Sequence, residues 1–303
     1  MDRCEKPQRV ALCIASYRRP QGLQALLGAL DAQRFEGPRP EIVLVIADND
    51  VAESARPVCE DARRWLSLPL RYVVEPRKGI PFARNATLRH AGDADWLAFI
   101  DDDEVPEPRW LDTLMRVQRE TDADVVTGPV LPRFSEPAPE WIVAGGLFDP
   151  PRYATGTRVQ SAHSNNVLLR RCRLDELDSR FDERLTLGVG EDTDLFDRLA
   201  ARGARIVWAD EALVHETVPP ARANTRWLVQ RGYRVGTALT HLDRKRRGPA
   251  AALAFGVAQG AWWMARGLLA AALGLLRGRA ERVRALQLVA SGVGRVAGLA
   301  GVR

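Results

Sequence analysis

The chain has 303 residues, of which 46% are hydrophobic and 27% are charged, and it has four scattered cysteines. This composition excludes a disordered chain, a collagen-like chain and a disulfide scaffold, and the length suffices for one large domain or two modest ones. The cysteines form no CxxC or Cys/His cluster, so we expect neither a zinc site nor disulfides, and a reducing cytosol fits best. The first residues show no charged-then-apolar signal pattern.

The net charge of +5 is unevenly distributed along the chain. Residues 244–303 contain 11 basic residues and one acidic residue, a net charge of +10, whereas residues 1–243 carry a net charge of −5. We therefore expect a mildly acidic main domain at residues 1–243 and a basic, apolar tail at residues 244–303. The boundary is expected within residues 242–248, where a run of four basic residues precedes Gly248 and Pro249.

Apolar runs of strand length alternate with segments of helical periodicity in the first half of the chain. The predicted strands are residues 9–15, 41–47, 70–74, 96–100 and 124–126. The predicted helices are residues 22–32, 53–66, 81–90, 109–120 and 193–202, and the Pro-rich residues 132–139 are predicted to form a loop. Because these strands are apolar throughout, the pattern predicts an α/β fold, a mostly parallel sheet with helices on both faces.

Three predicted strands end in polar residues. These ends are Ser16-Tyr17-Arg18, Asp48-Asn49-Asp50 and Asp101-Asp102-Asp103. In open α/β sheets a ligand binds beyond the carboxyl ends of the strands, so we expect the three segments to meet at one edge of the sheet.

The three consecutive aspartates are the sharpest motif in the sequence. Alternate residues of an extended segment point the same way, so Asp101 and Asp103 can face one ligand together. Carboxylate oxygens suit Mg²⁺ or Mn²⁺, which commonly bridge to substrate phosphates. The alternative is a solvated acidic turn that caps the next helix. The sequence contains no Walker A or GxGxxG loop, which argues against a P-loop NTPase and against a dinucleotide-dependent oxidoreductase.

Three further features each leave two interpretations open. Glu191 and Asp192 follow Gly188-Val189-Gly190 at a helix start, where one carboxylate can act as a general base, or Asp192 can cap the helix. His215 is a structural residue or an additional metal ligand. Arg222 and Arg226 belong to a solvated helix face or to a lid that meets a diphosphate.

The order of these motifs resembles the family 2 glycosyltransferases. The resemblance rests on Ala15-Ser16-Tyr17-Arg18-Arg19, then VIADND, Lys78-Gly79 with Ala83-Arg84-Asn85, FIDDDE with EPRWL, and GVGED, and it covers about residues 8–235. The stretch HETVPPARANTRWLVQRGYR is similar to the branch that builds bacterial exopolysaccharides, including succinoglycan-type glucosyltransferases. The resemblance implies a GT-A fold, with a nucleotide-binding half at about residues 8–130 and an acceptor half at about residues 131–243.

The resemblance also implies roles for individual residues. Tyr17 would lie against the base, Asp48 would accept a hydrogen bond from it, and the remaining nucleotide-binding residues would be Ser16, Arg18, Lys78, Arg84, Asp101 and Asp102. Asp101 and Asp103 match the DxD motif that binds a divalent metal, with His215 as a further candidate ligand. Asp192 matches the catalytic base, with Glu191 beside it as the second candidate. The segment 145–170, with His163, Asn165 and Asn166, is expected to line the acceptor or sugar pocket.

The sequence departs from the common family pattern at two motifs, one that concerns the nucleotide and one that concerns processive addition of sugars. The usual DDGS-like turn is replaced by Ala47-Asp48-Asn49-Asp50, and the QxxRW motif of processive synthases is absent. The absence of the QxxRW motif favours the addition of a single sugar. The resemblance implies an inverting transferase, and we expect its donor to be a UDP-sugar and its acceptor to be a hydroxyl of a glycan or lipid-linked glycan. The alternatives are a sugar-phosphate nucleotidyltransferase, which would need a Gly-rich loop, and a non-catalytic, membrane-bound sugar- or nucleotide-binding module. The tail is too apolar for a nucleic-acid partner.

The tail is expected to hold the enzyme on the cytoplasmic face of the membrane without a simple single span. Residues 248–265 form an uncharged run, but this run is rich in Ala and Gly, and basic residues flank it on both sides. The spacing of Arg266, Arg277, Arg284 and Arg295 predicts one basic stripe on an in-plane helix. A helical hairpin packed on the catalytic domain, a dimer contact and a re-entrant hairpin are the alternatives.

Overall fold

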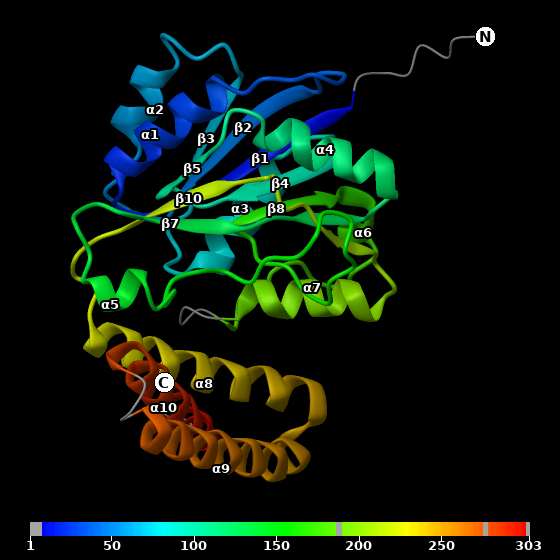
Figure 1. Ribbon diagram of the computed structural model, residues 1–303. Helices are drawn as coiled ribbons and strands as arrows, with labels where there is room; N and C mark the ends of the chain where they lie inside the picture. The colour runs from blue at the N-terminus through cyan, green and yellow to red at the C-terminus, as the bar shows by residue number, and fades with distance from the viewer. Residues whose placement is uncertain (1–7, 186–189, 275–277, 301–303) are drawn as a thin grey trace. The chain divides into compact units, whose positions relative to one another are not determined.

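The protein is described by a computed structural model that covers residues 8–185, 190–274 and 278–300 (Figure 1). The chain divides into two compact units, and each is described by itself. The first unit comprises Met1–Leu131 and Pro150–Glu216, and the second comprises Pro132–Asp149 and Thr217–Arg303. The helical unit therefore begins well before the boundary expected from sequence at residues 242–248.

A seven-stranded sheet forms the centre of the first unit, in the order β3-β2-β1-β4-β8-β6-β9. Its strands are β1 (Arg9–Ser16), β2 (Glu41–Asp48), β3 (Leu70–Val74), β4 (Trp96–Ile100), β6 (Val125–Thr127), β8 (Asn166–Arg170) and β9 (Ile206–Trp208). Neighbouring strands are parallel except at β8, which runs antiparallel to both β4 and β6. The first four strands and β6 lie where the sequence predicts strands, whereas the antiparallel β8 was not predicted.

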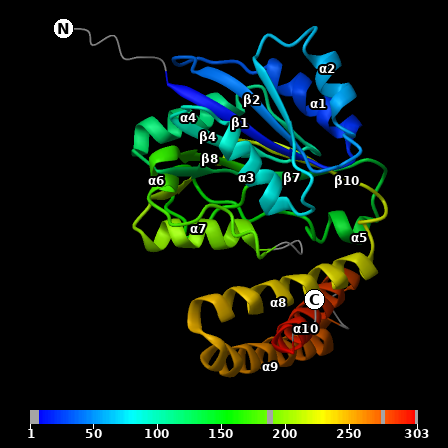
Figure 2. The same cartoon turned by 180° about the vertical axis from the view of Figure 1, so that it is seen from behind.

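Helices cover both faces of this sheet, which confirms the predicted α/β architecture (Figures 1 and 2). Alternate strand residues such as Leu12 and Leu44 pack against α1 (Pro20–Asp31), α2 (Arg56–Ala62) and α4 (Trp110–Thr121). The intervening residues, such as Cys13 and Phe99, pack against the helices of the other face, which are α3 (Ile80–His90), α6 (Arg171–Asp175) and α7 (Glu191–Ala201). Because both faces are buried, the strands read as continuous apolar runs in the sequence.

A smaller sheet has the order β5-β10-β7. Its strands are β5 (Glu104–Pro106), β7 (Val130–Phe134) and β10 (Val214–Val218), and β10 pairs antiparallel to β5. Strand β7 overlaps residues 132–139, which the sequence analysis predicted to be a loop. The prolines of residues 132–139 favoured a loop in the sequence. Only the first of them, Pro132, lies inside the five-residue strand β7, so the others do not prevent it from forming.

The second unit is mainly helical. It contains α5 (Glu140–Val143), α8 (Thr225–Arg247), α9 (Pro249–Gly274) and α10 (Arg279–Leu299), and α8 continues through the predicted domain boundary up to Arg247. Within the described ranges of the chain, none of the helices combines the length and the hydropathy that crossing a bilayer requires.

Glycines let α10 pack closely against both α8 and α9. Gly236 of α8 lies against the backbone at Ser291, and Gly260 of α9 lies against the backbone of Gly292. Since a glycine has no side chain, helix backbones can approach one another at these points more closely than any larger residue would allow.

Replacing Gly292 with alanine is expected to destabilise this helical unit by about 1–3 kcal/mol, because an added Cβ overpacks the helix contact. The Cβ would lie 2.6 Å from the backbone oxygen of Gly260 and 3.0 Å from the backbone nitrogen of Met264. The measurement is chemical denaturation followed by circular dichroism. Gly28→Ala in α1 is the matched control, since nothing lies within 4 Å of its added Cβ. We expect that control to be neutral or stabilising, through helix propensity.

The structure does not contain the predicted basic stripe of the tail. Arg295 is 5% exposed, and its Nη1 lies 2.6 Å from a carboxylate oxygen of Asp243. Arg284 donates to the backbone oxygen of Gly145, whereas Arg266 packs over the Trp262 ring and Arg277 lies outside the described residues. The prediction of one stripe was wrong, because residues 266 and 295 are on separate helices and Arg295 points into the core of the helical unit.

Candidate active site

A pocket of about 360 Å³ opens at the carboxyl ends of β1, β2 and β4. Tyr17, Arg18 and Lys78 line it, together with Ala15, Ser16, Arg19, Asn49, Ile80, Ala83, Asp101 and Asp102. Tyr17 is 40% exposed, and the guanidinium of Arg18 packs over its ring at 5.1 Å from the centroid. The three polar strand ends therefore meet at one site, as the sequence analysis expected.

Asp102 fixes the loop that follows β1. Its Oδ2 accepts hydrogen bonds from the hydroxyl of Ser16 at 2.8 Å and from the backbone nitrogen of Tyr17 at 3.1 Å. Its Oδ1 accepts one from Arg19 at 3.0 Å. The middle aspartate of the motif, predicted to bind nucleotide directly, thus holds the Ser16-Tyr17 loop in place and contributes to the pocket wall.

Asp48 forms its hydrogen bonds within the protein, and the hydrogen bond to the base that the resemblance implies for it stays a prediction. Asp48 is fully buried, and its carboxylate accepts hydrogen bonds from the backbone nitrogens of Asp50 and Ala55 and from the hydroxyl of Tyr72. These bonds use both oxygens to shape the turn after β2. The next residue, Asn49, lines the pocket, whereas Asp48 does not.

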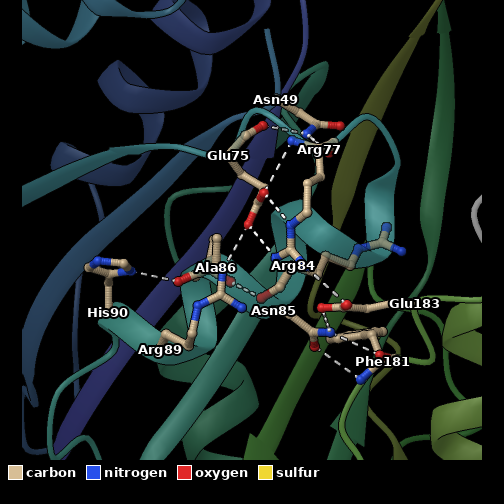
Figure 3. A network of polar contacts seen from close by, with 11 residues as sticks. Asn49, Glu75, Arg77, Arg84, Asn85, Ala86, Arg89, His90, Phe181 and Glu183 are labelled. Carbon is tan, nitrogen blue, oxygen red and sulfur yellow. Dashed lines mark hydrogen bonds and ion pairs between the residues drawn. The ribbon is translucent and has the colours of Figure 1, made fainter. Parts of the chain in front are cut away.

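A polar network that sequence reasoning missed joins this turn to α3 (Figure 3). Asn49 donates to the backbone oxygens of Glu75 and Arg77, and its Oδ1 accepts from the backbone nitrogen of Gly79. The hydrogen bonds and charge of Arg77 outweigh burial and lower the pKa of Glu75 to about 2. Arg77 also reaches Glu183 at 3.2 Å. The network orients the Lys78-Gly79 segment and links it to the segment before α7. In the sequence it is indicated only by Glu75, a glutamate directly after a predicted strand and two residues before Arg77.

Asp101 and Asp103 fit a divalent cation by their chemistry. Burial and the neighbouring carboxylates Asp103 and Asp102 raise the pKa of Asp101 to about 6, against the opposing charge of Arg84. A cation would relieve this repulsion, and the all-oxygen donor set suits Mg²⁺ or Mn²⁺. Among the described residues, no group of three or more His, Cys, Asp or Glu side chains is arranged to hold a metal ion by itself. A metal here would rely on phosphate oxygens and water for its other ligands, as Mg²⁺ commonly does.

His215 pairs with a different carboxylate. Its Nε2 lies 2.7 Å from Oε1 of Glu107, and on β10 it stands opposite Val105 of β5. Glu107 therefore engages one ring nitrogen of His215, and a role for this residue as a metal ligand stays a prediction. Arg222 and Arg226, the predicted lid residues, belong to the second unit, where Arg222 packs over the Trp227 ring; a lid role stays a prediction.

Arg84 of α3 bridges the acidic motif to the start of α7. It is 5% exposed, forms an ion pair with Glu191, and lies 3.2 Å from Oδ1 of Asp101. In the structure the guanidinium of Arg84 lies between two carboxylates, and the contact with the nucleotide that the resemblance implies for it stays a prediction. Burial raises the pKa of Glu191, although Arg84 opposes this effect, and Glu191 Oε2 is buried without a hydrogen-bond partner in the described part of the chain.

Asp192 is the more accessible member of the Glu191-Asp192 pair, with a side chain 19% exposed against 6% for Glu191. The N-cap of α7 is Gly190, at φ 110°, so Asp192 lies inside the first turn and does not cap the helix. Its Oδ2 lies 3.3 Å from Nδ1 of His163. Burial raises the pKa of Asp192, but the hydrogen bond and charge of His163, together with Arg84, lower it to about 2. Gly188 and Val189 of the motif lie outside the described residues.

The three predicted acceptor-pocket residues have different environments. His163 is beside Asp192, with its side chain 66% exposed, and Asn165 is half-buried. Asn166 is 1% exposed and structural, since it accepts a hydrogen bond from the Trp110 indole and donates to the backbone oxygens of Pro129 and Ala212. The prediction that Asn166 lines the acceptor pocket was therefore wrong.

Two comparisons of the sequence with known proteins each match more than half of the chain. The family model described as glycosyl transferase family 2 matches residues 11–173. The succinoglycan biosynthesis protein ExoM of Rhizobium meliloti (strain 1021) is 37% identical over 224 residues, which cover 74% of this chain and 71% of that protein.

Solved structures of similar fold include two that were determined with nucleotides. The mannosyltransferase PcManGT from Pyrobaculum calidifontis, in complex with GDP-Man and Mn²⁺, has a TM-score of 0.65 at 19% identity and covers 97% of this chain and 88% of that chain. S. aureus TarS 1–349, in complex with UDP, has a TM-score of 0.56 at 17% identity and covers 97% and 92%. The extent of the family match and the identity to the relative settle the assignment: this chain is a glycosyltransferase and belongs to the family 2 glycosyl transferases.

Proposed function

We propose that this glycosyltransferase transfers one sugar from a nucleotide-sugar, expected to be a UDP-sugar, to a hydroxyl of a glycan or lipid-linked glycan in exopolysaccharide synthesis. The relative named for succinoglycan biosynthesis supports the pathway class, and the neighbours solved with UDP and GDP-Man support a nucleotide-sugar donor. The observation that carries the proposal is the linked pair of acidic groups. Asp101 at the pocket and Glu191-Asp192 on α7 are joined through Arg84.

In this proposal the pocket binds the donor. Tyr17 presents an exposed ring for the base, and Lys78 and Arg18 supply positive charge for the diphosphate. Asp101 and Asp103 would hold a divalent cation, Mg²⁺ or Mn²⁺, which neutralises charge on the leaving diphosphate. Asp102 keeps the Ser16-Tyr17 loop in the geometry that donor binding requires.

Asp192 is the proposed general base. Its carboxylate takes the proton from the acceptor hydroxyl as that oxygen attacks the anomeric carbon and the bond to the diphosphate breaks. A single displacement inverts the anomeric centre, so an α-linked donor gives a β-glycoside. Glu191 is less suited to this role, because it is buried and paired with Arg84. His163 orients Asp192 through their contact and favours its ionised form.

The test of the donor proposal is a thermal-shift panel with UDP, GDP, dTDP and CDP, each with and without Mn²⁺. Binding to the folded state stabilises it by RT ln(1 + [L]/Kd), so the correct nucleotide should give the largest shift. We expect UDP with Mn²⁺ to stand out. If none of the four nucleotides gives a metal-dependent shift, the proposed donor site is wrong.

His163→Gln is expected to move the acidic limb of the pH–rate profile upward by about one pH unit. Wild-type Asp192 stays ionised well below neutrality, because the His163 contact lowers its pKa. Without that positive charge, the pKa of Asp192 rises and the carboxylate protonates at higher pH, so activity is lost earlier as pH falls. The measurement is kcat/KM from acidic to neutral pH. His90→Gln, the same change at a surface histidine of α3, should leave the limb in place.

A further inference from the structure

The outward face of α9 is almost entirely apolar. Leu253, Val257, Trp262, Leu268 and Leu269 are between 49% and 64% exposed. The other outward positions are alanines, at 250, 251, 254, 258, 261, 265 and 272, and a single arginine. That arginine, Arg266, is the one charged residue in the 26 residues of the helix. Successive positions three or four apart place these side chains in adjacent stripes that run along the helix.

This arrangement is the reverse of an ordinary surface helix, which buries its apolar stripe and exposes its polar one. The side of α9 that packs on α10 contains glycines, with Gly256 against Leu299, Gly260 against Val296 and Gly267 against Val289. The helical unit therefore forms its inner contacts with the glycines of α9, together with Phe255 and Trp263, which pack against Arg295. The five large side chains named above remain exposed, and an apolar surface of this extent indicates a binding partner.

Basic residues flank this face at both ends of α9. Arg244, Lys245, Arg246 and Arg247 end α8 immediately before it, and Arg279 and Arg282 lie in the first turns of α10 after it. Over its sequence, the second unit contains 16 basic and five acidic residues, a net charge of +11. Two such surfaces would repel one another, which disfavours a second copy of the chain, whereas an anionic lipid surface complements both the charge and the apolar side chains.

We propose that α9 lies in the plane of an anionic lipid bilayer, with Leu253, Val257, Trp262, Leu268 and Leu269 immersed among the acyl chains. Arg266 and the basic residues at the two ends of α9 meet the lipid phosphates, and the indole N–H of the immersed Trp262 reaches up to the interfacial level. An in-plane helix needs only one apolar face, so it does not need the length and hydropathy of a span. This inference concerns attachment alone and does not depend on the donor, the metal or the base proposed above.

The experiment is flotation of the full chain with vesicles, comparing pure phosphatidylcholine with an equal mixture of phosphatidylcholine and phosphatidylglycerol. We expect the chain to float with the anionic vesicles and to bind them less at high salt, without complete release. The variant Trp262→Gln/Leu268→Gln/Leu269→Gln should reduce the partition coefficient by at least about tenfold, because three immersed side chains are lost. All three positions are exposed, so circular dichroism should show the helical content of the wild type.

Trp65→Gln is the matched control, since Trp65 is an exposed tryptophan of the first unit and 43% accessible. That variant should float as the wild type does. The proposal is overturned if the full chain does not bind anionic vesicles, or if the triple variant binds them as well as the wild type. A wild-type dimer without lipid that becomes monomeric in the triple variant would also overturn it and assign the face to a second copy. Loss of vesicle binding with an unchanged nucleotide thermal shift would show that attachment and the donor site are separate.

Discussion

Replacing Asp192 with asparagine is expected to lower kcat by about 10²–10⁴-fold, the usual contribution of a general base. Asparagine has nearly the same shape and can keep the contacts to His163 and to the backbone of Thr193, but it cannot accept the proton of the acceptor hydroxyl. Donor binding should therefore survive, because Asp192 is not among the residues that line the donor pocket. The measurements are steady-state transfer with a nucleotide-sugar and the thermal shift with UDP and Mn²⁺.

Asp197→Asn is the matched control, the same substitution further along α7. It should keep transfer within a few-fold of the wild type. An equal loss of nucleotide binding and turnover in Asp192→Asn would instead assign Asp192 a structural role at the start of the helix. A large loss in Glu191→Gln with normal turnover in Asp192→Asn would transfer the role of base to Glu191.

Replacing Asp103 with asparagine is expected to abolish the metal-dependent part of the nucleotide thermal shift and to lower kcat by at least about 10²-fold. Asp103 and Asp101 are the carboxylates proposed to hold the cation, so the loss of one weakens the neutralisation of the diphosphate. The unliganded protein should lose little stability, because the substitution weakens a half-exposed ion pair with Arg19 but also removes one of the charges that raise the pKa of Asp101. The shift is measured with UDP at increasing Mn²⁺ concentration.

Asp102→Asn is expected to have the opposite effects, a lower stability of the unliganded protein and a metal response that persists. Asp102 receives hydrogen bonds from Ser16, Tyr17 and Arg19, so we expect its loss of charge to lower the stability of the unliganded protein by about 1–3 kcal/mol. Metal dependence should persist in whatever donor binding remains. If Asp102→Asn removed the metal response while Asp103→Asn kept it, the assignment of the metal to Asp101 and Asp103 would be wrong.

The strand ends were predictable because they follow from local pattern. Apolar runs that stop at Ser16, Asp48 and Asp101 identify parallel strands and the edge where they meet, and the structure brings Ser16 and Asp101 to one pocket. The antiparallel β8 was not predictable in the same way, since its register with β4 and β6 depends on contacts between residues far apart in sequence.

Residue roles were harder to infer than positions, because a polar side chain can serve the protein as well as a ligand. Asp48 and Asn166 fit a binding motif in sequence, yet both are buried hydrogen-bond centres. The spacing of Arg295 predicted a place in a basic surface stripe. It is instead buried in the helical unit, where it pairs with Asp243, which is 52 residues away in the sequence. The contact between His163 and Asp192 joins a loop to the start of α7, and no local sequence pattern predicts such a pair.

The position of α10 affects when the helical unit can form during synthesis. This helix is translated after α8 and α9, and the close glycine contacts of both helices are made with it. Until it emerges, α8 and α9 lack the partner that covers their inner sides, whereas all strands of the main sheet are already complete by Trp208. The order of translation therefore places folding of the catalytic sheet before assembly of the helical unit, and α9 is exposed to whatever surface is nearby in the interval.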